Sequence, residues 1–376
     1  MRYIVCGTVV HQEYEDDILQ LSNAANRFLL NFTNEIKKIY PIKILSYVGI
    51  DISTEIKEKL RKRNNSDSDL AYYFKSRFKV AGVVAYWHTV SRNLRDAECI
   101  IAYNPVYAYL NVPYMAHRHK KKSILILADY SPEETYKGRL RRIYALLQLK
   151  SIRKYDMVIG LSENTKVYLA DNQEFIHMPG GINGFVYDYF REKRNSEESD
   201  KIVLMYAGTL EKVTGIDMLL EAFEQIEDED VELWISGKGS MVSLVEQFVE
   251  KDDRIKYLGC PSYNEYLDNL KSADILVNPR NMDLPENKNN FPSKILEYLA
   301  TGKQIVSTKF PGWEKFADYI SFCEKGIKNM RESLKCAYLE AMREKDQRYK
   351  KNRQFAEQFL WSRQMEKVLK NVEMPE

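Results

Sequence analysis

Short runs of apolar, β-branched and aromatic residues alternate with longer stretches of helical period along almost the whole chain. This alternation is typical of βα units that build a parallel sheet, and it excludes all-helical and all-β folds. It occurs twice. In the first half, strands are predicted near residues 2–7, 42–48, 81–86, 98–102, 123–128, 156–161 and 174–178. In the second half, strands are predicted near residues 201–207, 231–236, 254–258, 274–278, 304–308 and 319–323.

A charged stretch without any apolar residue, REKRNSEESD at Arg191–Asp200, separates the two sets of strands and is typical of a linker. The chain of 376 residues is long enough for two domains of roughly 100–200 residues each. We therefore predict an α/β protein with two doubly wound, Rossmann-like domains, 1–190 and 200–353. A long amphipathic helix near Gln347–Val372 has no strand to follow, and residues 354–376 are expected to complete the first domain.

Charge and cysteine content exclude several classes of protein. Lys and Arg number 56 against 54 Asp and Glu, a net charge of +2, so no global field attracts nucleic acid. The five cysteines are scattered and form no C-x-x-C pair, which argues against a disulfide framework or a zinc site and favours a reducing compartment. The opening MRYIVCGTVV is too short for a signal peptide, and no window approaches the ~18 apolar residues that span a membrane. We expect a cytoplasmic protein.

One strand end in the second half is followed by an unusually informative segment. Open α/β sheets bind ligands at the carboxyl ends of their strands, so a ligand is expected in the crevice between the two domains. After the strand that ends at residues 278–280 (Asn-Pro-Arg), a polar loop leads to FPSKILEYLATG. Pro292 and Ser293 are typical of a helix start and Gly302 of a helix end, which predicts a helix over about Ser293–Thr301.

The start of this predicted helix carries groups that suit a nucleotide. Its free N–H groups and dipole would form an anion site for a diphosphate, to which Lys294 and Arg280 add full charges. Glu297 lies one turn after Ser293, where its carboxylate can accept two hydrogen bonds from a ribose diol. The alternative is an ordinary capped helix whose glutamate is solvated.

The run FPSKILEYLATGKQIVST resembles the nucleotide-binding helix of the family 4 glycosyltransferases, which are retaining enzymes of the GT-B fold. It is preceded at the expected intervals by YAGTLEKVTGIDMLLEAF (206–223), WISGKGSM (234–241) and YLGCPSYNEYLDNLKSADILVNPR (257–280), and followed by FLWSRQMEKVL (359–369). VIGLSENTKVYL and FIHMPGGINGFVY (175–187) are similar to the strands and the Gly-Gly turn before the family's linker. The resemblance covers residues 156–369 well and the earlier part only as a general architecture.

This resemblance implies two domains facing a central crevice, a C-terminal helix that crosses back to the first domain, and retaining transfer of a sugar. The donor would be a nucleotide diphosphate sugar, and the acceptor a saccharide or lipid-linked saccharide in bacterial surface polysaccharide assembly. Neither a metal nor another cofactor is implied, because protein cations and helix N–H groups would stabilise the leaving diphosphate. The donor-binding residues implied are Gly208, Thr209, Gly237, Ser293, Lys294, Ile295 and Glu297.

The sequence also departs from the family pattern. The first Glu of the usual E-x7-E falls on Asn289, and the Arg and Lys of the glycine loop fall on Thr209 and Thr214. Lys212 is the candidate to supply the missing charge, so the catalytic candidates are Lys212, Arg280 and Lys294, together with an acidic residue of the first domain. The departures leave open a catalytically silent subunit that supports a partner, and the architecture also admits a nucleotide-sugar 2-epimerase.

The acidic candidate is Asp129, which ends the predicted strand of SILILADYSP at residues 123–132. It would orient the donor sugar or the acceptor hydroxyl, or it caps a helix that begins near Pro132. Gly7, at the end of the first strand, and His88 are further candidates on the acceptor side, although a turn glycine and a surface histidine are the commoner meanings.

Two D-x-D triplets, at residues 67–69 and 228–230, resemble the metal-binding triplet of metal-dependent transferases. Neither follows a predicted strand, and both lie in polar loops. We interpret them as solvated loops and expect no metal site.

Two basic runs, at residues 117–122 and 137–154, make the first domain locally cationic. The second run alternates with leucines and predicts a helix with one apolar and one cationic face, which suits an anionic membrane surface and a lipid-linked acceptor. The alternative is a helix packed on the sheet with a solvated outer face. Nucleic acid is not expected, because no RNA-binding motif accompanies the charge. The sequence carries no signal for an oligomeric state.

Overall fold

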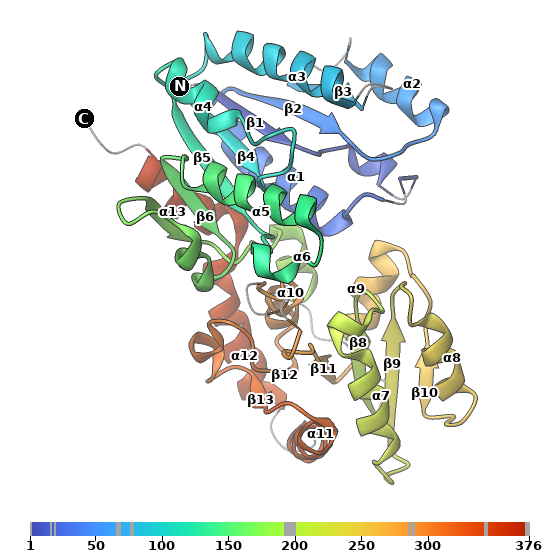
Figure 1. The fold of residues 1–376 in the computed structure, drawn as a ribbon. Helices are drawn as coiled ribbons and strands as arrows, with labels where there is room; N and C mark the ends of the chain where they lie inside the picture. Colours follow the sequence, from blue (N-terminus) through green and yellow to red (C-terminus); the bar gives the residue numbers. More distant parts are fainter. Residues whose placement is uncertain are drawn as a thin grey trace. The chain divides into compact units, whose positions relative to one another are not determined.

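The computed structural model describes residues 2–15, 17–18, 20–64, 69–75, 79–191, 201–284, 287, 290–341 and 345–372. The chain divides into two compact units, each built around one sheet (Figure 1). The first unit combines Met1–Pro179 with Met365–Glu376, and the second is Gly180–Gln364.

The first unit contains a seven-stranded parallel sheet of order β3-β2-β1-β4-β5-β6-β7. Its strands are β1 (Tyr3–Gly7), β2 (Ile42–Val48), β3 (Leu70–Phe74), β4 (Cys99–Tyr103), β5 (Lys122–Leu127), β6 (Met157–Gly160) and β7 (Glu174–His177). Its helices are α1 (Asn23–Lys37), α2 (Thr54–Arg63), α3 (Lys79–Leu94), α4 (Val112–Arg118) and α5 (Arg139–Ile152), with 3-10 helices at Gln12–Tyr14, Glu133–Thr135 and Glu163–Tyr168.

The second unit contains a six-stranded parallel sheet of order β10-β9-β8-β11-β12-β13. Its strands are β8 (Ile202–Ala207), β9 (Val231–Ser236), β10 (Ile255–Tyr257), β11 (Ile275–Asn278), β12 (Gln304–Thr308) and β13 (Ser321–Cys323). Its helices are α6 (Gly184–Tyr189), α7 (Ile216–Glu224), α8 (Val242–Val249), α9 (Tyr263–Ser272), α10 (Lys294–Thr301), α11 (Ile327–Ala341) and α12 (Lys345–Ala356). Short 3-10 helices lie at Lys212–Thr214, Trp313–Phe316 and Glu357–Phe359, and α13 (Trp361–Val372) begins in this unit and ends in the first.

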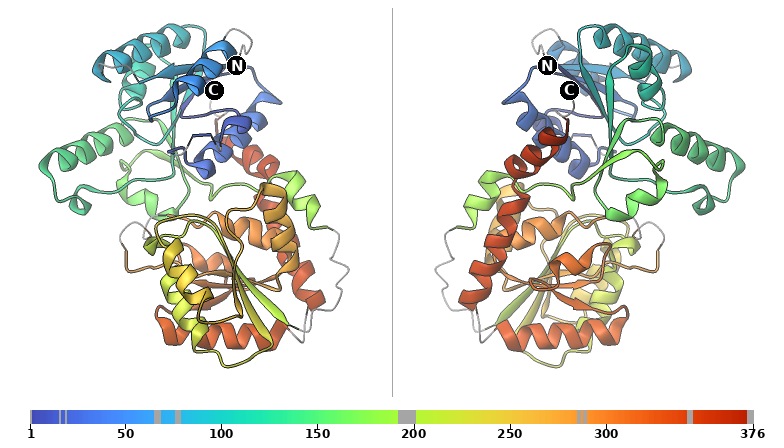
Figure 2. Two further views of the ribbon diagram at one scale, coloured as in Figure 1. Left: turned by 90° about the vertical axis from the view of Figure 1, so that its right-hand side faces the viewer. Right: turned by 90° about the vertical axis from the view of Figure 1, so that its left-hand side faces the viewer.

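The central strands explain why both sheets are covered by helices on both faces (Figure 2). β1, β4, β6, β11 and β12 are buried along their whole length. A strand reaches that state only when neither face meets water, so near-continuous apolar runs require helices above and below. The prediction of two Rossmann-like α/β domains is confirmed by these two parallel sheets.

The predicted strand at 81–86 is wrong, because these residues lie within α3. The apolar run AGVVAY has strand composition, but the buried side chains Val83, Tyr86, Val90 and Leu94 recur at helical spacing. The edge strand is instead β3, where Leu70 and Tyr72 are buried in alternation.

The long predicted helix near the end of the chain is interrupted between α12 and α13. Leu360 takes an extended conformation there and pairs with Ile182. The Ile182 N–H donates to the Phe359 carbonyl at 2.7 Å, and the Trp361 N–H donates to the Ile182 carbonyl at 3.0 Å. These backbone groups bond to a neighbouring segment instead of continuing the helix.

The division between the units falls at Pro179–Gly180, before the predicted domain boundary at 190, because α6 packs on α10 of the second unit. The predicted linker 191–200 lies outside the described residues beyond Arg191. Within the described ranges, no helix combines the length and apolar character that crossing a bilayer demands.

Candidate functional site

The strand order of the second unit reverses direction at β8, the position where doubly wound sheets commonly bind ligands. The chain builds the sheet outward from β8 in one direction through β9 and in the other through β11. Loops that leave β8 and β11 at their carboxyl ends therefore turn away to opposite faces of the sheet, which opens a crevice between them. Gly208 and Thr209 follow β8, and Arg280 follows β11 after Pro279.

Glycines allow the loops at this edge to touch backbone to backbone. A Cβ on Gly237, whose φ is +142°, would lie 1.7 Å from the Gly208 carbonyl oxygen. A Cβ on Gly215, whose φ is +73°, would lie 1.9 Å from the Pro279 carbonyl oxygen. No side chain fits at either position, so the loops after β8, β9 and β11 form one close-packed rim. Sequence comparison alone pointed to Gly208 and Gly237, and the structure brings these two together.

Thr209 lies beside a buried phenol, that of Tyr206. The Tyr206 hydroxyl donates to the Thr209 carbonyl at 2.7 Å. Burial raises the pKa of Tyr206 to about 12, and hydrogen bonding to Thr214 and the positive charge of Arg280 act in the opposite sense. Nη1 of Arg280 donates to the Asn290 carbonyl at 3.4 Å.

Lys212 begins the 3-10 helix after β8 and is exposed. Within the described residues, Lys212 makes no hydrogen bond to Arg280 or Lys294. Its neighbour Glu211 fixes the loop after β9 by accepting a hydrogen bond from the Ser240 N–H at 2.8 Å. This bonding to Ser240 lowers the pKa of Glu211.

Helix α10 begins where the sequence predicts, directly after Pro292 and Ser293. The amides of Ile295 and Leu296 already donate to the carbonyls of Pro292 and Ser293, at 2.9 and 3.1 Å. Ile295 is fully buried and its amide is engaged inside this first turn. A ligand at this helix end would therefore meet Ser293, which is exposed, and Lys294, which is half-buried, before it met Ile295.

Glu297 is held by a tyrosine that sequence reasoning missed. Tyr266, on α9, donates its hydroxyl hydrogen to Oε2 of Glu297 at 2.6 Å. Nζ of Lys294 lies 3.3 Å from the same hydroxyl and 4.3 Å from the centre of the Tyr266 ring. Burial, reinforced by the charge of Glu297, raises the pKa of Tyr266 well above its usual value, so this phenol remains a neutral donor.

A signal for Tyr266 is present in the sequence. It lies with Leu267 and Leu270 on the buried side of an amphipathic helix, and a buried tyrosine hydroxyl requires a polar partner. The identity of that partner depends on how α9 packs on α10, which local pattern does not specify.

In the first unit, Asp129 follows β5 and is exposed. Its amide and that of Ala128 both donate to Oδ1 of Asn104, at 3.0 and 2.8 Å. Asn104 follows β4 with a φ of +55°, an uncommon conformation for a residue other than glycine. Asp129 caps no helix, because the next 3-10 helix begins after Pro132 and α5 after Gly138. Asn104 is thus a second missed residue, and it fixes the turn that carries Asp129.

The remaining predicted positions are placed differently. Gly7 ends β1 and is buried against α1, where a Cβ would lie 2.8 Å from Cδ1 of Leu29, so packing accounts for this glycine. His88 is exposed and lies past the middle of α3, and the structure does not bring it to the carboxyl edge of the sheet.

Of the two D-x-D triplets, the one at residues 228–230 lies in the loop before β9. Asp67 and Ser68 lie outside the described residues, whereas Asp228 accepts a hydrogen bond from the Asp230 N–H at 2.9 Å. Within the part of the chain that the structure describes, no group of three or more His, Cys, Asp or Glu side chains is arranged to hold a metal ion.

Comparisons with known proteins agree with this geometry. Residues 201–327, which hold the loops and α10, match the family described as glycosyl transferases group 1. Among curated proteins, no match is found. Solved structures similar over 99% of this chain include Anabaena HepE in complex with UDP, at 13% identity, a TM-score of 0.73 and 99% of that chain. A second is the lipopolysaccharide outer core galactosyltransferase WaaB, at 14% identity, a TM-score of 0.65 and 100% of that chain. A third is sucrose-phosphate synthase of Thermosynechococcus elongatus, at 12% identity, a TM-score of 0.70 and 99% of that chain.

Proposed function

We propose that this protein is a glycosyltransferase that transfers a sugar from a nucleotide diphosphate sugar with retention of configuration. The match of residues 201–327 to the glycosyl transferases group 1 family and the fold shared with solved glycosyltransferases support this proposal. The acceptor is a saccharide or a lipid-linked saccharide. The observation that carries this proposal is the packing of α10 at the end of β8, where the Tyr298 hydroxyl lies 3.3 Å from the nitrogen and the oxygen of Ala207, next to the glycine rim. The same helix carries Lys294 and Glu297, which both contact the Tyr266 hydroxyl.

The chemistry requires stabilisation of the leaving diphosphate. Charge develops on its oxygen as the glycosidic bond breaks and the sugar approaches an oxocarbenium ion. Lys294 and Arg280 supply positive charge, and the dipole of α10 adds to it at the helix start. Asp129 is proposed to orient the sugar or the acceptor hydroxyl, and no metal is assigned a role. Solved complexes of Anabaena HepE hold UDP, UDP-glucose, or UDP with glucose, which supports a nucleotide-sugar donor for this chain.

A panel of UDP-, GDP- and other nucleotide sugars tests the proposal. The purified protein is expected to bind at least one of them in calorimetry and to hydrolyse it slowly without an acceptor. In NMR, the product is expected to keep the anomeric configuration of the donor. Binding without turnover would favour a silent subunit, release of an epimerised nucleotide sugar would favour a 2-epimerase, and no binding at all would contradict the proposal.

We further propose that the protein works as a peripheral protein at an anionic, cytoplasmic membrane face, which it meets through α5. Four apolar residues of this helix are exposed, with Leu140 at 82% and Ile143, Leu146 and Leu147 near one half. Arg142 and Lys150 are exposed beside them. The sequence left open a helix that buries its apolar face on the sheet, but these side chains face away from the core. Apolar residues flanked by cations suit the boundary of headgroups and acyl chains.

Vesicle co-sedimentation tests this surface. The wild type is expected to bind anionic vesicles more tightly than neutral ones and to be released at high salt. Replacing Leu140, Ile143 and Leu147 together with serine should weaken binding about ten-fold or more, since each buried aliphatic side chain contributes on the order of 1 kcal/mol. Leu339→Ser on α11 removes an equally exposed leucine of the other unit and serves as the control. Equal binding to neutral vesicles, or no effect of the triple change, would contradict this location.

A further inference from the structure

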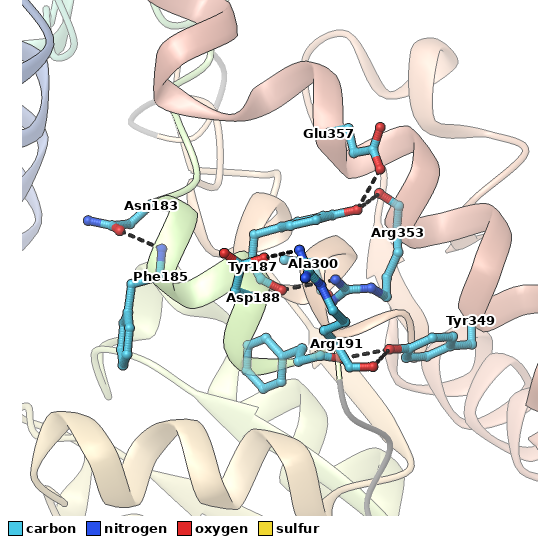
Figure 3. A network of polar contacts seen from close by, with 10 residues as sticks. Asn183, Phe185, Tyr187, Asp188, Arg191, Ala300, Tyr349, Arg353 and Glu357 are labelled. Carbon is cyan, nitrogen blue, oxygen red and sulfur yellow. Dashed lines mark hydrogen bonds and ion pairs between the residues drawn. The ribbon is translucent and has the colours of Figure 1, made fainter.

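Arg353 of α12 is a buried cation whose partners are backbone carbonyls (Figure 3). It is 7% exposed, and its Nη1 donates to the Ala300 carbonyl at 2.7 Å and its Nη2 to the Tyr187 carbonyl at 3.0 Å. Both carbonyls lie in the last turn of a helix, Ala300 in α10 and Tyr187 in α6. The carbonyl end of a helix carries partial negative charge, so one guanidinium stabilises two helix ends at once.

Two tyrosines enclose this guanidinium. It lies 4.2 Å from the ring centre of Tyr187 and 5.5 Å from that of Tyr349. The Tyr349 hydroxyl is 2.6 Å from the Phe190 carbonyl oxygen and 2.9 Å from that of Arg191, so it caps the same end of α6. None of the ion pairs formed within the described ranges includes Arg353. Its charge is therefore balanced by helix ends and aromatic faces, a geometry that needs the planar fork of arginine.

Two further contacts hold α10, one at its end and one nearer its start. Gly302, which ends α10 with a φ of +74°, lies so close to α12 that a Cβ would be 2.5 Å from Cδ2 of Tyr349. Nearer the start of the helix, the Tyr298 hydroxyl lies 3.3 Å from both the nitrogen and the oxygen of Ala207, the residue before Gly208. A helix of eight residues spans about 12 Å and moves as one rigid piece. A shift at Ala300 would therefore carry Lys294 and Glu297 with it.

We infer that Arg353 is a positioning residue for the donor helix, which it holds in the axial position where Ser293, Lys294 and Glu297 meet the nucleotide. The inference rests on the proposed function. Arg353 touches neither the nucleotide nor the sugar, and it acts through α10. Lysine has a single nitrogen in place of the two that bond the two carbonyls and lacks the planar guanidinium that lies against Tyr187, so the conservative substitution is expected to fail.

The test compares Arg353→Lys and Arg353→Met in the full chain. Arg348→Met is the matched control, because Arg348 lies on the same helix and bonds Gln304 and Glu340 instead of α10. Both Arg353 variants are expected to raise the Kd for UDP and the KM for the donor sugar about ten-fold. They should also lower kcat, by less than Lys294→Ala does, because a shifted α10 displaces Lys294 together with Glu297 without removing its charge. Hydrogen exchange should accelerate at residues 294–301 and stay unchanged at 216–224 in α7.

Unchanged affinity and exchange in both Arg353 variants would overturn the inference. Faster exchange in α7 as well as α10, with a parallel fall in Tm, would also overturn it, because Arg353 would then support the unit as a whole. If the wild type binds no nucleotide, the proposed function fails, while exchange at α10 in the unliganded protein still decides the role of Arg353.

Discussion

Replacing Glu297 with alanine is expected to weaken the binding of UDP and of the donor sugar by about 1–3 kcal/mol, because a ribose hydroxyl pair loses a charged acceptor. Calorimetry with UDP measures the loss directly. Glu297→Gln keeps one acceptor oxygen and should lose less. Tyr266→Phe, which removes only the donor that holds Oε2 of Glu297, should lose least.

These three variants also separate binding from stability. Glu297→Ala leaves the buried Tyr266 hydroxyl without this acceptor, so a fall in Tm is expected alongside the loss of affinity. If UDP binds Glu297→Ala as tightly as wild type, the donor site lies on another helix. A loss that Tyr266→Phe reproduces in full would instead mean that the carboxylate serves to pack α9 on α10.

Replacing Lys294 or Arg280 with alanine is expected to reduce kcat by about 10²–10³, more than it raises the KM for the donor, if each cation acts on charge that develops in the transition state. Steady-state kinetics with the preferred donor gives both parameters. Lys212→Ala is the informative companion, because Lys212 is exposed on the loop after β8 where the family usually has cations. A comparable fall in kcat would show that Lys212 supplies the missing charge.

Other outcomes would lead to different conclusions. Equal losses in kcat/KM and in affinity would mean that Lys294 and Arg280 bind the diphosphate equally in ground state and transition state. If kcat and KM are unchanged in both variants, and Glu297→Ala also binds UDP as tightly as wild type, the donor site does not lie at the edge of the second sheet.

Helix α10 was predictable because its determinants are local. Pro292 and Ser293 start it, Gly302 ends it in a left-handed conformation, and Glu297 falls one turn inside. The partners of these residues were not predictable in the same way. Tyr266 reaches Glu297 across two helices whose packing depends on the whole unit, and no periodicity in either segment encodes that pairing.

The same distinction applies to the first unit. The pattern predicted that Asp129 is a polar residue after a buried strand. The hydrogen bond from its amide to Oδ1 of Asn104 could not be predicted, because it depends on the neighbouring strand β4 and on the positive φ of Asn104. Residues 81–86 were wrongly predicted as a strand, because the prediction relied on their β-branched composition and not on the helical spacing of the buried residues. Short apolar runs near a sheet edge are the weakest case for pattern reading, since a helix and a strand can share their composition.

The path of the chain between the two units has a consequence for synthesis on the ribosome. The second unit is one continuous segment, whereas the first is completed only by Met365 and the residues after it. In α13, Met365, Val368, Leu369 and Val372 are buried, and Lys367 donates to the His177 carbonyl at 3.1 Å. The unit that is translated first is therefore the last to be finished. Part of the apolar surface of the first unit stays uncovered until Met365 and the residues after it have been made.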